Sequence, residues 1–387
     1  MAIPLPERER ATIEAPASGL RVAALFSLVR NPYGQLLYAA LAEHGVHLVT
    51  DSRLELGWLW RQRRHVTFLH FHWDEWHYEP RSPRRRFRAL QAWLKMAHFA
   101  SMLALARILG YRIIWTVHEV LPHESPSPRR DLVAARMLAR ASHVLMAHDQ
   151  ATATRATGLL RPGIKMTDVI PHGSYVGAYP PGRPRALVRE EWGLRDSSFV
   201  FLAFGNLRSY KRLDLLLDAF ARVADPDVAL VIAGEFVSRF PEPEWVRCTL
   251  ARLQGAAERD PRIRCRIGTV PVAEVAELHD ACDAAVFGRS DGWTSGSMIL
   301  ALSQGLPVIA ARRPAYVELL GDSAAGWLYE PGDVNSLSDT LTLAAAEPDR
   351  AREKGHQAGR RGAALGWQGI AAGTAAVMMS TLSNGHS

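Results

Sequence analysis

The sequence has few cysteines and no long hydrophobic run. Its 387 residues include three cysteines, and none of them forms a Cys-x-x-Cys pair. This scarcity argues against a disulfide framework or a zinc module and favours a reducing cytosol. No uninterrupted run of about 18 apolar residues occurs, which argues against a membrane-spanning helix. The charged segment Met1–Pro16 lacks the apolar core of a secretory signal.

Internal repeats, low-complexity tracts and recognised nucleic-acid modules are also lacking. At roughly 100–200 residues per domain, the length suits two α/β domains. The formal net charge is +7 and the sequence pI is about 9.6. This excess favours a polyanionic partner, which could be nucleic acid, an acidic membrane surface or a phosphorylated substrate.

Short apolar runs alternate with helix-periodic stretches, a pattern typical of parallel sheets covered by helices. A segment rich in Pro and Gly, Tyr175–Arg185, is expected to link two such domains. We predict a lead-in (1–19), a first Rossmann-like domain (20–180), a second (181–360) and a C-terminal helix (361–387) that packs back toward the first. The predicted strands are 22–26, 65–72, 112–118, 142–148, 168–171, 199–205, 228–234, 262–268, 284–287 and 307–310. Ligands of such open sheets bind at the carboxyl ends of the strands, so we expect the motifs to line a cleft between the domains.

The strongest local motif runs from Gly205 to Lys211, between a predicted strand and a predicted helix. Its glycine lets the backbone approach a ligand closely. Arg208 offers a planar fork and Lys211 a point charge, and this pair suits a diphosphate. A solvated basic turn would have the same composition, so both interpretations stay open.

A second anion-binding candidate is the helix start at Thr294, Ser295, Gly296 and Ser297. Small and hydroxylated residues there leave backbone N–H groups free, and the helix dipole favours an anion. An ordinary Ser/Thr N-cap is the alternative. Together with Arg208 and Lys211, this helix start suggests a diphosphate cradle.

Taken in order, the motifs resemble those of family 4 glycosyltransferases, which have the GT-B architecture. The resemblance extends from about Arg21 to Asp333. In the C-terminal half it rests on Gly205–Lys211, Ala233–Glu235, Ile267–Pro271, Thr294–Gly296, Gly305–Ile309 and Gly326–Asp333. The N-terminal half resembles a bacterial branch with β-mannosyltransferase-like polysaccharide enzymes, in Asn31–Tyr33, His70–Glu75, Trp115–Glu119, Pro122–Glu124 and Pro171–Gly173.

This resemblance implies a GT-B fold, two Rossmann-like domains with parallel sheets, and a nucleoside-diphosphate sugar donor, with a GDP-sugar favoured. It implies no metal and no further cofactor. The diphosphate would be held by Gly205, Arg208, Lys211, Thr294, Ser295, Gly296 and Ser297. The base and ribose would contact Gly234, Thr269, Val270, Asp291 and Glu318.

One departure from the family concerns its two glutamates. The second, just before the Ala-x-x-x-Gly of the helix, is replaced by Leu300, and the first falls at Gly292 beside Asp291. Ribose and sugar recognition must therefore differ, and the family's retaining stereochemistry cannot simply be carried over. Asp291 and Glu318 are the candidates to replace the missing carboxylates.

The N-terminal half should supply the acceptor site and any general base. His118 lies where the family places a histidine near the transferred sugar, although a structural histidine fits the same position. The segment His70–His77 contains tryptophans, whose ring faces suit stacking on sugar rings. A His-x-His metal site is the alternative for this segment, although a third metal ligand is not evident. The base candidates are His118, Glu119, Asp74 and Glu75. The candidates for acceptor or sugar binding are Asn31, Tyr33, His72, Trp73, His123, Glu124 and His172.

Five arginines occur between Arg81 and Arg88, before an apolar helical run that ends near Leu109. A solvated helix start explains them, and so does a patch that rests on anionic lipid or binds a phosphorylated acceptor.

We therefore expect a cytoplasmic glycosyltransferase, with peripheral contact at the inner face of the membrane, that acts on a lipid-linked glycan or a small specialised metabolite. One rival is a GT-B sugar-nucleotide epimerase, which would turn over the donor without an acceptor. The other is a non-enzymatic protein that binds membranes or nucleic acid through its basic surface.

Overall fold

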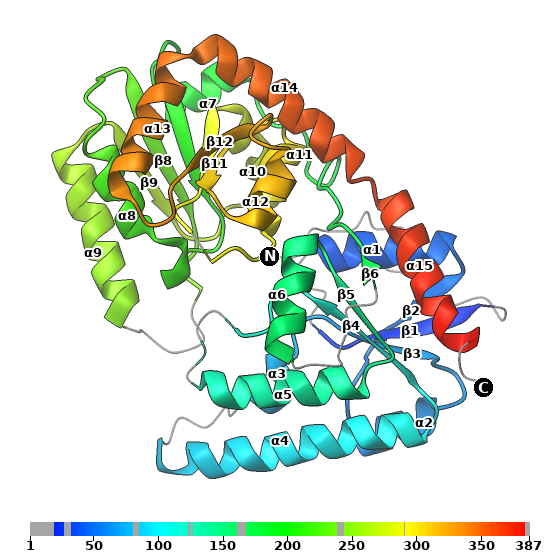
Figure 1. Ribbon diagram of the computed structural model, residues 1–387. Coiled ribbons are helices and arrows are strands. Elements are labelled where there is room, and N and C mark those ends of the chain that lie inside the picture. The colour runs from blue at the N-terminus through cyan, green and yellow to red at the C-terminus, as the bar shows by residue number, and fades with distance from the viewer. Residues whose placement is uncertain are drawn as a thin grey trace. The chain divides into compact units, whose positions relative to one another are not determined.

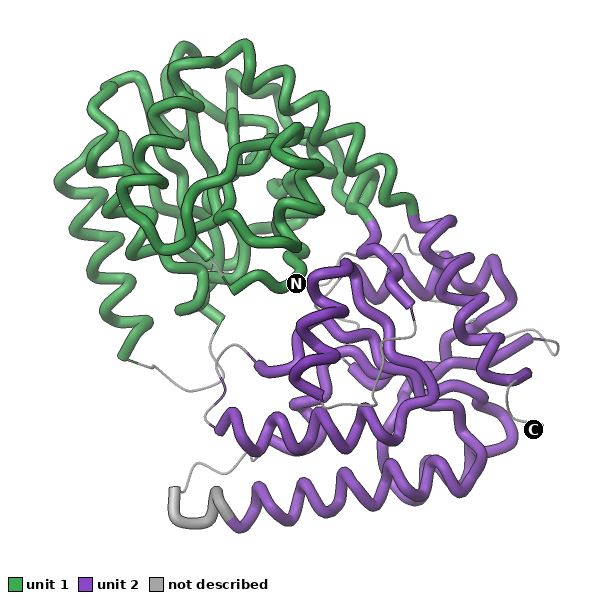
Figure 2. Tube along the Cα trace, viewed as in Figure 1, with its two compact units in different colours: residues 1, 174–366 green, residues 2–173, 367–387 purple. Residues whose placement is uncertain are grey.

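The computed structural model describes residues 19–26, 32–79, 85–122, 125, 127–160, 168–237, 244–289 and 291–383, with only the backbone given for 85–89. The chain forms two compact units, residues 2–173 with 367–387 and residues 174–366 (Figure 2). Asn31, His123, Glu124 and the side chains of Arg81–Arg88 lie outside the described residues. No helix in the described ranges is long and apolar enough to cross a membrane.

The N-terminal unit contains a six-stranded parallel sheet in the order β2-β1-β3-β4-β5-β6. Helices α1 and α15 cover one face, and α4 and α5 lie on the other (Figure 1). The strands are β1 (Leu20–Ala24), β2 (Val46–Val49), β3 (Phe68–Phe71), β4 (Arg112–Val117), β5 (Val144–Ala147) and β6 (Asp168–Val169). The helices are α1 (Pro32–Glu43), α2 (Leu56–Gln62), α3 (Glu75–Tyr78), α4 (Arg85–Ile108), α5 (Pro128–Ala141), α6 (Gln150–Leu160) and α15 (Trp367–Ser383).

Helix α15, at the end of the chain, packs against α1 of the N-terminal unit. It buries Ala371, Ala375 and Met378 in the same apolar cluster as Leu37 and Leu41 of α1. The predicted C-terminal element began at residue 361, but residues 361–364 belong to α14 of the other unit, and the helix that packs on α1 begins at Trp367.

The C-terminal unit has a second six-stranded parallel sheet, in the order β12-β11-β10-β7-β8-β9. Leucines of α8 and α13 pack on one face of it, and α10, α11 and α12 lie on the other (Figure 1). Its strands are β7 (Phe199–Phe204), β8 (Val228–Gly234), β9 (Ile263–Ile267), β10 (Ala284–Val286), β11 (Val308–Ala311) and β12 (Gly326–Tyr329). Its helices are α7 (Arg185–Glu191), η2 (Ser209–Lys211), α8 (Leu213–Phe220), α9 (Glu244–Arg259), α10 (Val272–Asp280), α11 (Gly296–Ser303), α12 (Pro314–Leu320), α13 (Val334–Ala346) and α14 (Pro348–Ala364).

The boundary between the units lies earlier than the sequence suggested. We predicted a linker at Tyr175–Arg185 and a domain end at residue 180, but residues 174–180 group with the C-terminal unit. Tyr175 is buried, and its backbone N–H donates a hydrogen bond to Ser303 Oγ over 2.8 Å. Packing at this one side chain outweighs the loop-like composition around it.

Two glycines at the carboxyl ends of β7 and β8 touch each other. A Cβ atom on Gly234 would collide with the carbonyl oxygen of Gly205, and both residues have positive φ, 148° and 104°. Gly234 was a candidate for base binding, yet this contact by itself requires a glycine there. The contact also fixes the Gly205 turn.

We expect Gly234→Ala to destabilise the C-terminal unit by about 1–3 kcal/mol more than Gly268→Ala. Gly268 has a similar φ of 143° but open space where a Cβ would lie, so the difference isolates the collision. Urea unfolding of both variants measures it. Equal losses of unfolding free energy would show that backbone strain alone accounts for the effect.

Candidate functional site

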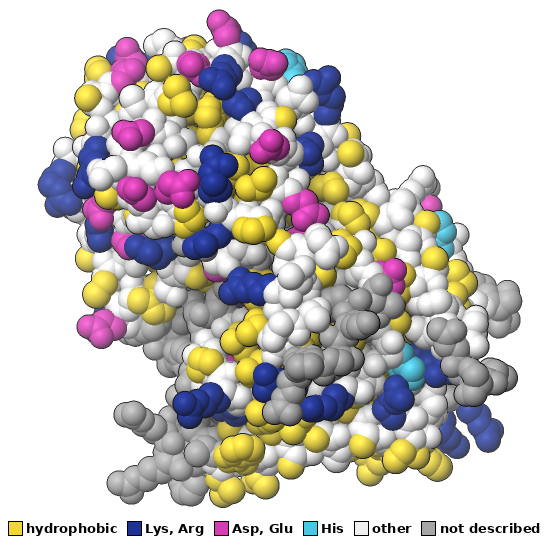
Figure 3. Space-filling view, in the orientation of Figure 1, with side chains coloured by type: hydrophobic (Ala, Val, Ile, Leu, Met, Phe, Trp, Pro, Cys, Tyr) yellow, Lys and Arg dark blue, Asp and Glu magenta, His cyan; other side chains and the backbone are white. Residues whose placement is uncertain are grey.

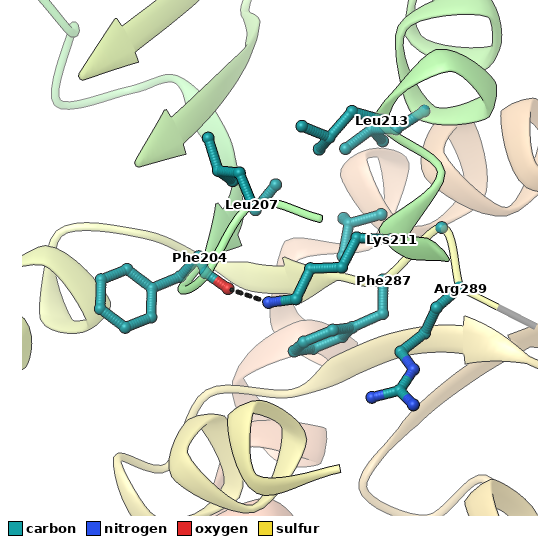
Figure 4. Close-up of a pocket in the computed structure, with 10 residues that line it drawn as sticks. Phe204, Leu207, Lys211, Leu213, Phe287 and Arg289 are labelled. Carbon is teal, nitrogen blue, oxygen red and sulfur yellow. Dashed lines mark hydrogen bonds between the residues drawn. The ribbon is translucent and has the colours of Figure 1, made fainter. Parts of the chain in front are cut away.

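Lys211 lies at the carboxyl edge of the second sheet, in the 3-10 helix η2 that follows β7. Its Nζ donates hydrogen bonds to the carbonyl oxygen of Phe204 at 3.2 Å and to Ser297 Oγ at 3.5 Å. The side chain extends beside Phe287, with Arg289 close by (Figure 4). A Cβ on Gly205 would lie 3.1 Å from Ser297 Oγ and 3.2 Å from Lys211 Nζ. The structure therefore brings together three residues that the sequence assigned to the diphosphate.

Arg289, which the sequence analysis missed, joins this group from the end of β10. It is 5% exposed and makes a bidentate ion pair with Asp291, with N–O distances of 2.9 and 2.7 Å. Its guanidinium lies 4.9 Å from the centre of the Tyr210 ring, and Tyr316 donates a hydrogen bond to Asp291 Oδ1 at 2.8 Å. Its place just after a predicted central strand was the available signal.

The positive charges affect one another. Burial, together with the charges of Arg289 and Arg208, lowers the pKa of Lys211 to about 7. The lysine is thus poised between its charged and neutral forms at neutral pH. A bound anion would favour the charged form.

The helix start at α11 divides its roles between two serines. Ser295 is the N-cap, and its side chain accepts a hydrogen bond from the Met298 N–H at 3.4 Å. Ser297 faces Lys211 instead. Thr294 and Gly296 are half-buried. The alternative interpretation as an ordinary N-cap is therefore right for Ser295.

The residues expected around the base and ribose are more scattered. Thr269 is exposed, and its hydroxyl donates to Glu235 Oε2 at 2.8 Å. Val270 is half-buried, and Glu318 is exposed on α12. The cavity that Lys211 and Arg289 line has a volume of only about 10 Å³, room for roughly one water molecule. A nucleotide would have to bind outside it.

A cluster of histidines marks the carboxyl edge of the N-terminal sheet. His72, His118 and His148 directly follow β3, β4 and β5, and His172 follows β6 by three residues. Because these strands are parallel neighbours, their ends bring the four imidazoles together. Ring centres are 5.3 Å apart for His72 and His118, 4.6 Å for His118 and His148, and 5.1 Å for His148 and His172.

Aromatic side chains surround this histidine cluster. The Tyr33 ring lies 4.6 to 5.6 Å from all four imidazoles. Trp73 stacks on His118 at 4.2 Å with an interplanar angle of 14°, and Trp367 of α15 lies 5.5 Å from Tyr33. Tyr33, His72, Trp73 and His172, which the sequence selected separately, thus belong to one site with His118.

Hydrogen bonds link the inner imidazoles in a chain. His118 Nε2 lies 3.0 Å from His72 Nδ1, and the Tyr38 hydroxyl lies 3.4 Å from His72 Nε2 and 3.0 Å from His70 Nδ1. His70 Nε2 reaches Thr116 Oγ1 at 2.8 Å. His148 is separate, with Nδ1 3.0 Å from the carbonyl oxygen of Ile170. His148 was missed, although it ends a predicted strand as His118 does.

Burial is the largest influence on the titration of these groups. It lowers the pKa of His148 to about 4 and those of His70 and His172 to about 3. The pKa values of His72 and His118 also fall well below the ordinary value, for the same reason and because other histidines are close. The cluster is therefore uncharged at neutral pH.

The carboxylate candidates for the general base are neighbours in sequence of Trp73 and His118. Asp74 and Glu75 are each 4% exposed, and Glu119 is half-buried. Burial, followed by the charge of Glu75, raises the pKa of Asp74 well above its usual value. This favours a protonated Asp74, which is less suited to accept a proton than a neutral imidazole. Among the described residues, no group of three His, Cys, Asp or Glu side chains could hold a metal ion.

Comparison with known proteins finds a family match within the C-terminal unit. Residues 184–362 match the family described as "Glycosyl transferases group 1". All of these matched residues lie in the C-terminal unit. A Xanthomonas campestris pv. campestris relative, "GDP-mannose:glycolipid 4-beta-D-mannosyltransferase", is 28% identical over 348 residues, 86% of each chain. "D-inositol 3-phosphate glycosyltransferase" of Segniliparus rotundus is 27% identical over 72% of this chain but 63% of its own length.

Solved structures show that the fold is GT-B, as the resemblance implied. Sucrose-phosphate synthase from Thermosynechococcus elongatus superposes with a TM-score of 0.72 and 16% identity, covering 94% of this chain and all of its own. Anabaena HepE in complex with UDP and glucose gives a TM-score of 0.67 at 16% identity, with the same coverage. The family match and these relatives support glycosyltransferase activity.

We expect the protein to lose stability as the pH falls below about 6.5, where unfolded histidines begin to titrate. The unfolded chain then binds protons that the buried imidazoles of the folded protein do not bind. The free energy of unfolding therefore falls by about 1.4 kcal/mol per pH unit for each such histidine. His77, whose pKa burial lowers to about 4, offers a matched variant. Urea unfolding from pH 7.5 to 5 should show a shallower pH dependence for His77→Gln than for the wild type. Parallel curves would contradict this prediction.

Proposed function

We propose that the chain transfers a sugar from a GDP-sugar to a hydroxyl group of a glycolipid or of a small hydroxylated acceptor. The observation that carries the donor half is the convergence of Lys211, Arg289 and Gly205 at the carboxyl edge of β7 and β10. Arg208 adds a further positive charge, which contributes to lowering the pKa of Lys211. A glycine turn beside several cations is suited to a diphosphate.

The preference for GDP rests on sequence similarity. The Xanthomonas campestris relative, whose name specifies GDP-mannose and a glycolipid, aligns over 86% of both chains. HepE was solved with UDP, but at 16% identity that similarity concerns the fold. We therefore favour GDP and treat UDP as the competing donor nucleotide.

Charge stabilisation would be the main contribution of the C-terminal unit. As the bond between sugar and diphosphate breaks, negative charge develops on the departing phosphate. Lys211, Arg208 and Arg289 would neutralise it without a metal ion. This role requires Lys211 to be protonated when the diphosphate is bound.

The N-terminal unit would supply the acceptor site and the base. In an inverting transfer, the acceptor hydroxyl gives its proton to His118 while its oxygen bonds to the anomeric carbon and GDP departs. The hydrogen bond between His118 and His72 gives that proton a path toward Tyr38. We favour His118 over Asp74 because burial raises the pKa of Asp74 well above its usual value.

We expect Lys211→Ala to weaken GDP binding about ten- to a hundredfold, because a charge-assisted hydrogen bond contributes about 1.5–3 kcal/mol. Calorimetric titration of GDP and of UDP, in buffer with EDTA, measures this and identifies the nucleotide. Lys354→Ala is the control. Lys354 belongs to α14 and lies over the ring of Trp327, so its replacement should not change the affinity for either nucleotide.

The same titrations test the charge state of Lys211. Binding at pH 8 should take up a proton, seen as a dependence of the measured heat on the buffer, because the free lysine has a pKa of about 7. Affinity should fall as the pH rises above 7. Failure of both nucleotides to bind wild type would refute the donor site.

A membrane contact would bring the enzyme to a glycolipid. Helix α4 follows the arginine-rich segment and exposes Leu90, Trp93, Leu94 and Ile108 by 60% to 81%. With Ala97, Ser101 and Ala104 they form one exposed helix face. Hydrophobic side chains cover this lower edge of Figure 3, close to Lys and Arg side chains. An apolar face beside cations suits the surface of an anionic membrane.

We expect the full chain to float with vesicles that contain phosphatidylglycerol, and less with pure phosphatidylcholine vesicles or at high salt. Trp93→Asp combined with Leu94→Asp should abolish flotation. Leu187→Asp, which alters an exposed leucine of the other unit, should have no effect. Equal flotation of all variants would refute the α4 contact.

A further inference from the structure

His148 carries a buried nitrogen that receives no hydrogen bond from the described residues. The residue is 6% exposed, and no donor or acceptor in the described part of the chain reaches its Nε2. Its Nδ1 faces the carbonyl oxygen of Ile170 at 3.0 Å. A carbonyl oxygen can only accept, so Nδ1 carries the proton and the neutral ring has its lone pair on Nε2. Buried acceptors are nearly always paired, so this one calls for a donor beyond the described side chains.

The neighbouring imidazoles do not supply that donor. His172 Nδ1 faces the carbonyl oxygen of Gly173 at 2.7 Å, so the proton of this neutral ring is on Nδ1. Its Nε2 therefore has no proton to donate to His148. His118 Nε2 is already within 3.0 Å of His72 Nδ1. An O–H group from outside these residues, of a water molecule or of a ligand that displaces it, would supply the donor.

The surroundings of His148 favour an uncharged ligand. The rings that contact the four histidines come from Phe26, Tyr33, Tyr38, His70, Trp73 and Trp367. Among the described residues, the charges that shift the pKa values of His148 and His172 come from Asp149 and His148, and not from a lysine or arginine. Asp149, the neighbouring carboxylate, accepts hydrogen bonds from the backbone N–H and hydroxyl of Thr152. A phosphate would need cations, whereas aromatic faces and neutral acceptors suit the C–H and O–H groups of a sugar ring.

We propose that the four histidines form a subsite for an uncharged sugar ring of the acceptor, in which His148 Nε2 accepts a hydrogen bond from a ring hydroxyl. This assignment rests on the proposed function, in which the N-terminal unit binds the acceptor. It selects a neutral glycoside, such as the sugar of a glycolipid, over a phosphorylated polyol. His148 is thus a binding residue that determines specificity, next to the catalytic candidate His118.

The test uses the full chain labelled with [15N]histidine and observed by NMR. The probes are octyl β-D-glucoside below its critical micelle concentration and, separately, inositol phosphate and inorganic phosphate. We expect Nε2 of His148 to be unprotonated in the free protein and its resonance to shift with the glucoside only. A protonated Nε2, no shift with the glucoside, or an equal shift with either phosphate would overturn the proposal.

Variants separate binding from structure. His148→Phe should weaken glucoside binding about tenfold, the effect of losing one hydrogen bond, whereas His148→Gln should retain most of it through its amide oxygen. His77→Phe is the matched control: it replaces another buried histidine of this unit, one that pairs with the carbonyl oxygen of Leu25, and should not change glucoside affinity. Wild-type affinity in His148→Phe would refute the role of His148.

A parallel GDP titration distinguishes the two proposals. If GDP binds and the glucoside does not shift His148, the subsite is wrong and the donor site stands. If the glucoside binds as expected and neither GDP nor UDP does, the sugar subsite stands and the glycosyl-transfer proposal fails. If His148→Phe does not fold, the wild-type spectra and His148→Gln still decide.

Discussion

The parallel arrangement of both sheets is the constraint on which the sites depend. When every strand runs the same way, all carboxyl ends meet at one edge, and residues far apart in sequence become neighbours. In the C-terminal sheet this edge collects Gly205, Lys211 and Arg289 from the ends of β7 and β10. In the N-terminal sheet it collects one histidine from each of four adjacent strands.

Burial acts on both edges but with different electrostatic results. It lowers the pKa of Lys211 and of the histidines alike, because a low-dielectric surrounding penalises their charged forms. The C-terminal edge keeps its positive charge because it contains arginines, which do not lose their protons. The histidines have no such companions among the described contacts and become neutral. One edge is thus suited to phosphate and the other to hydroxyl groups.

The sequence was a good guide wherever several residues formed a pattern. Apolar runs located ten of the twelve described strands, and the motif from Gly205 to Lys211 lies at the carboxyl edge of the second sheet. Strands β2 and β12, each at an edge of its sheet, were missed. Arg289 and His148 were missed because each is a single residue whose importance comes from neighbours on other strands.

The replacement of a family glutamate by Leu300 has a structural counterpart in the Arg289–Asp291 pair. Leu300 is 5% exposed on α11, so that position is apolar. Asp291, a candidate to replace the missing carboxylate, already receives Arg289 and the Tyr316 hydroxyl. A buried guanidinium without this partner would be strongly destabilising. Asp291 therefore serves first to hold Arg289 near the strand end.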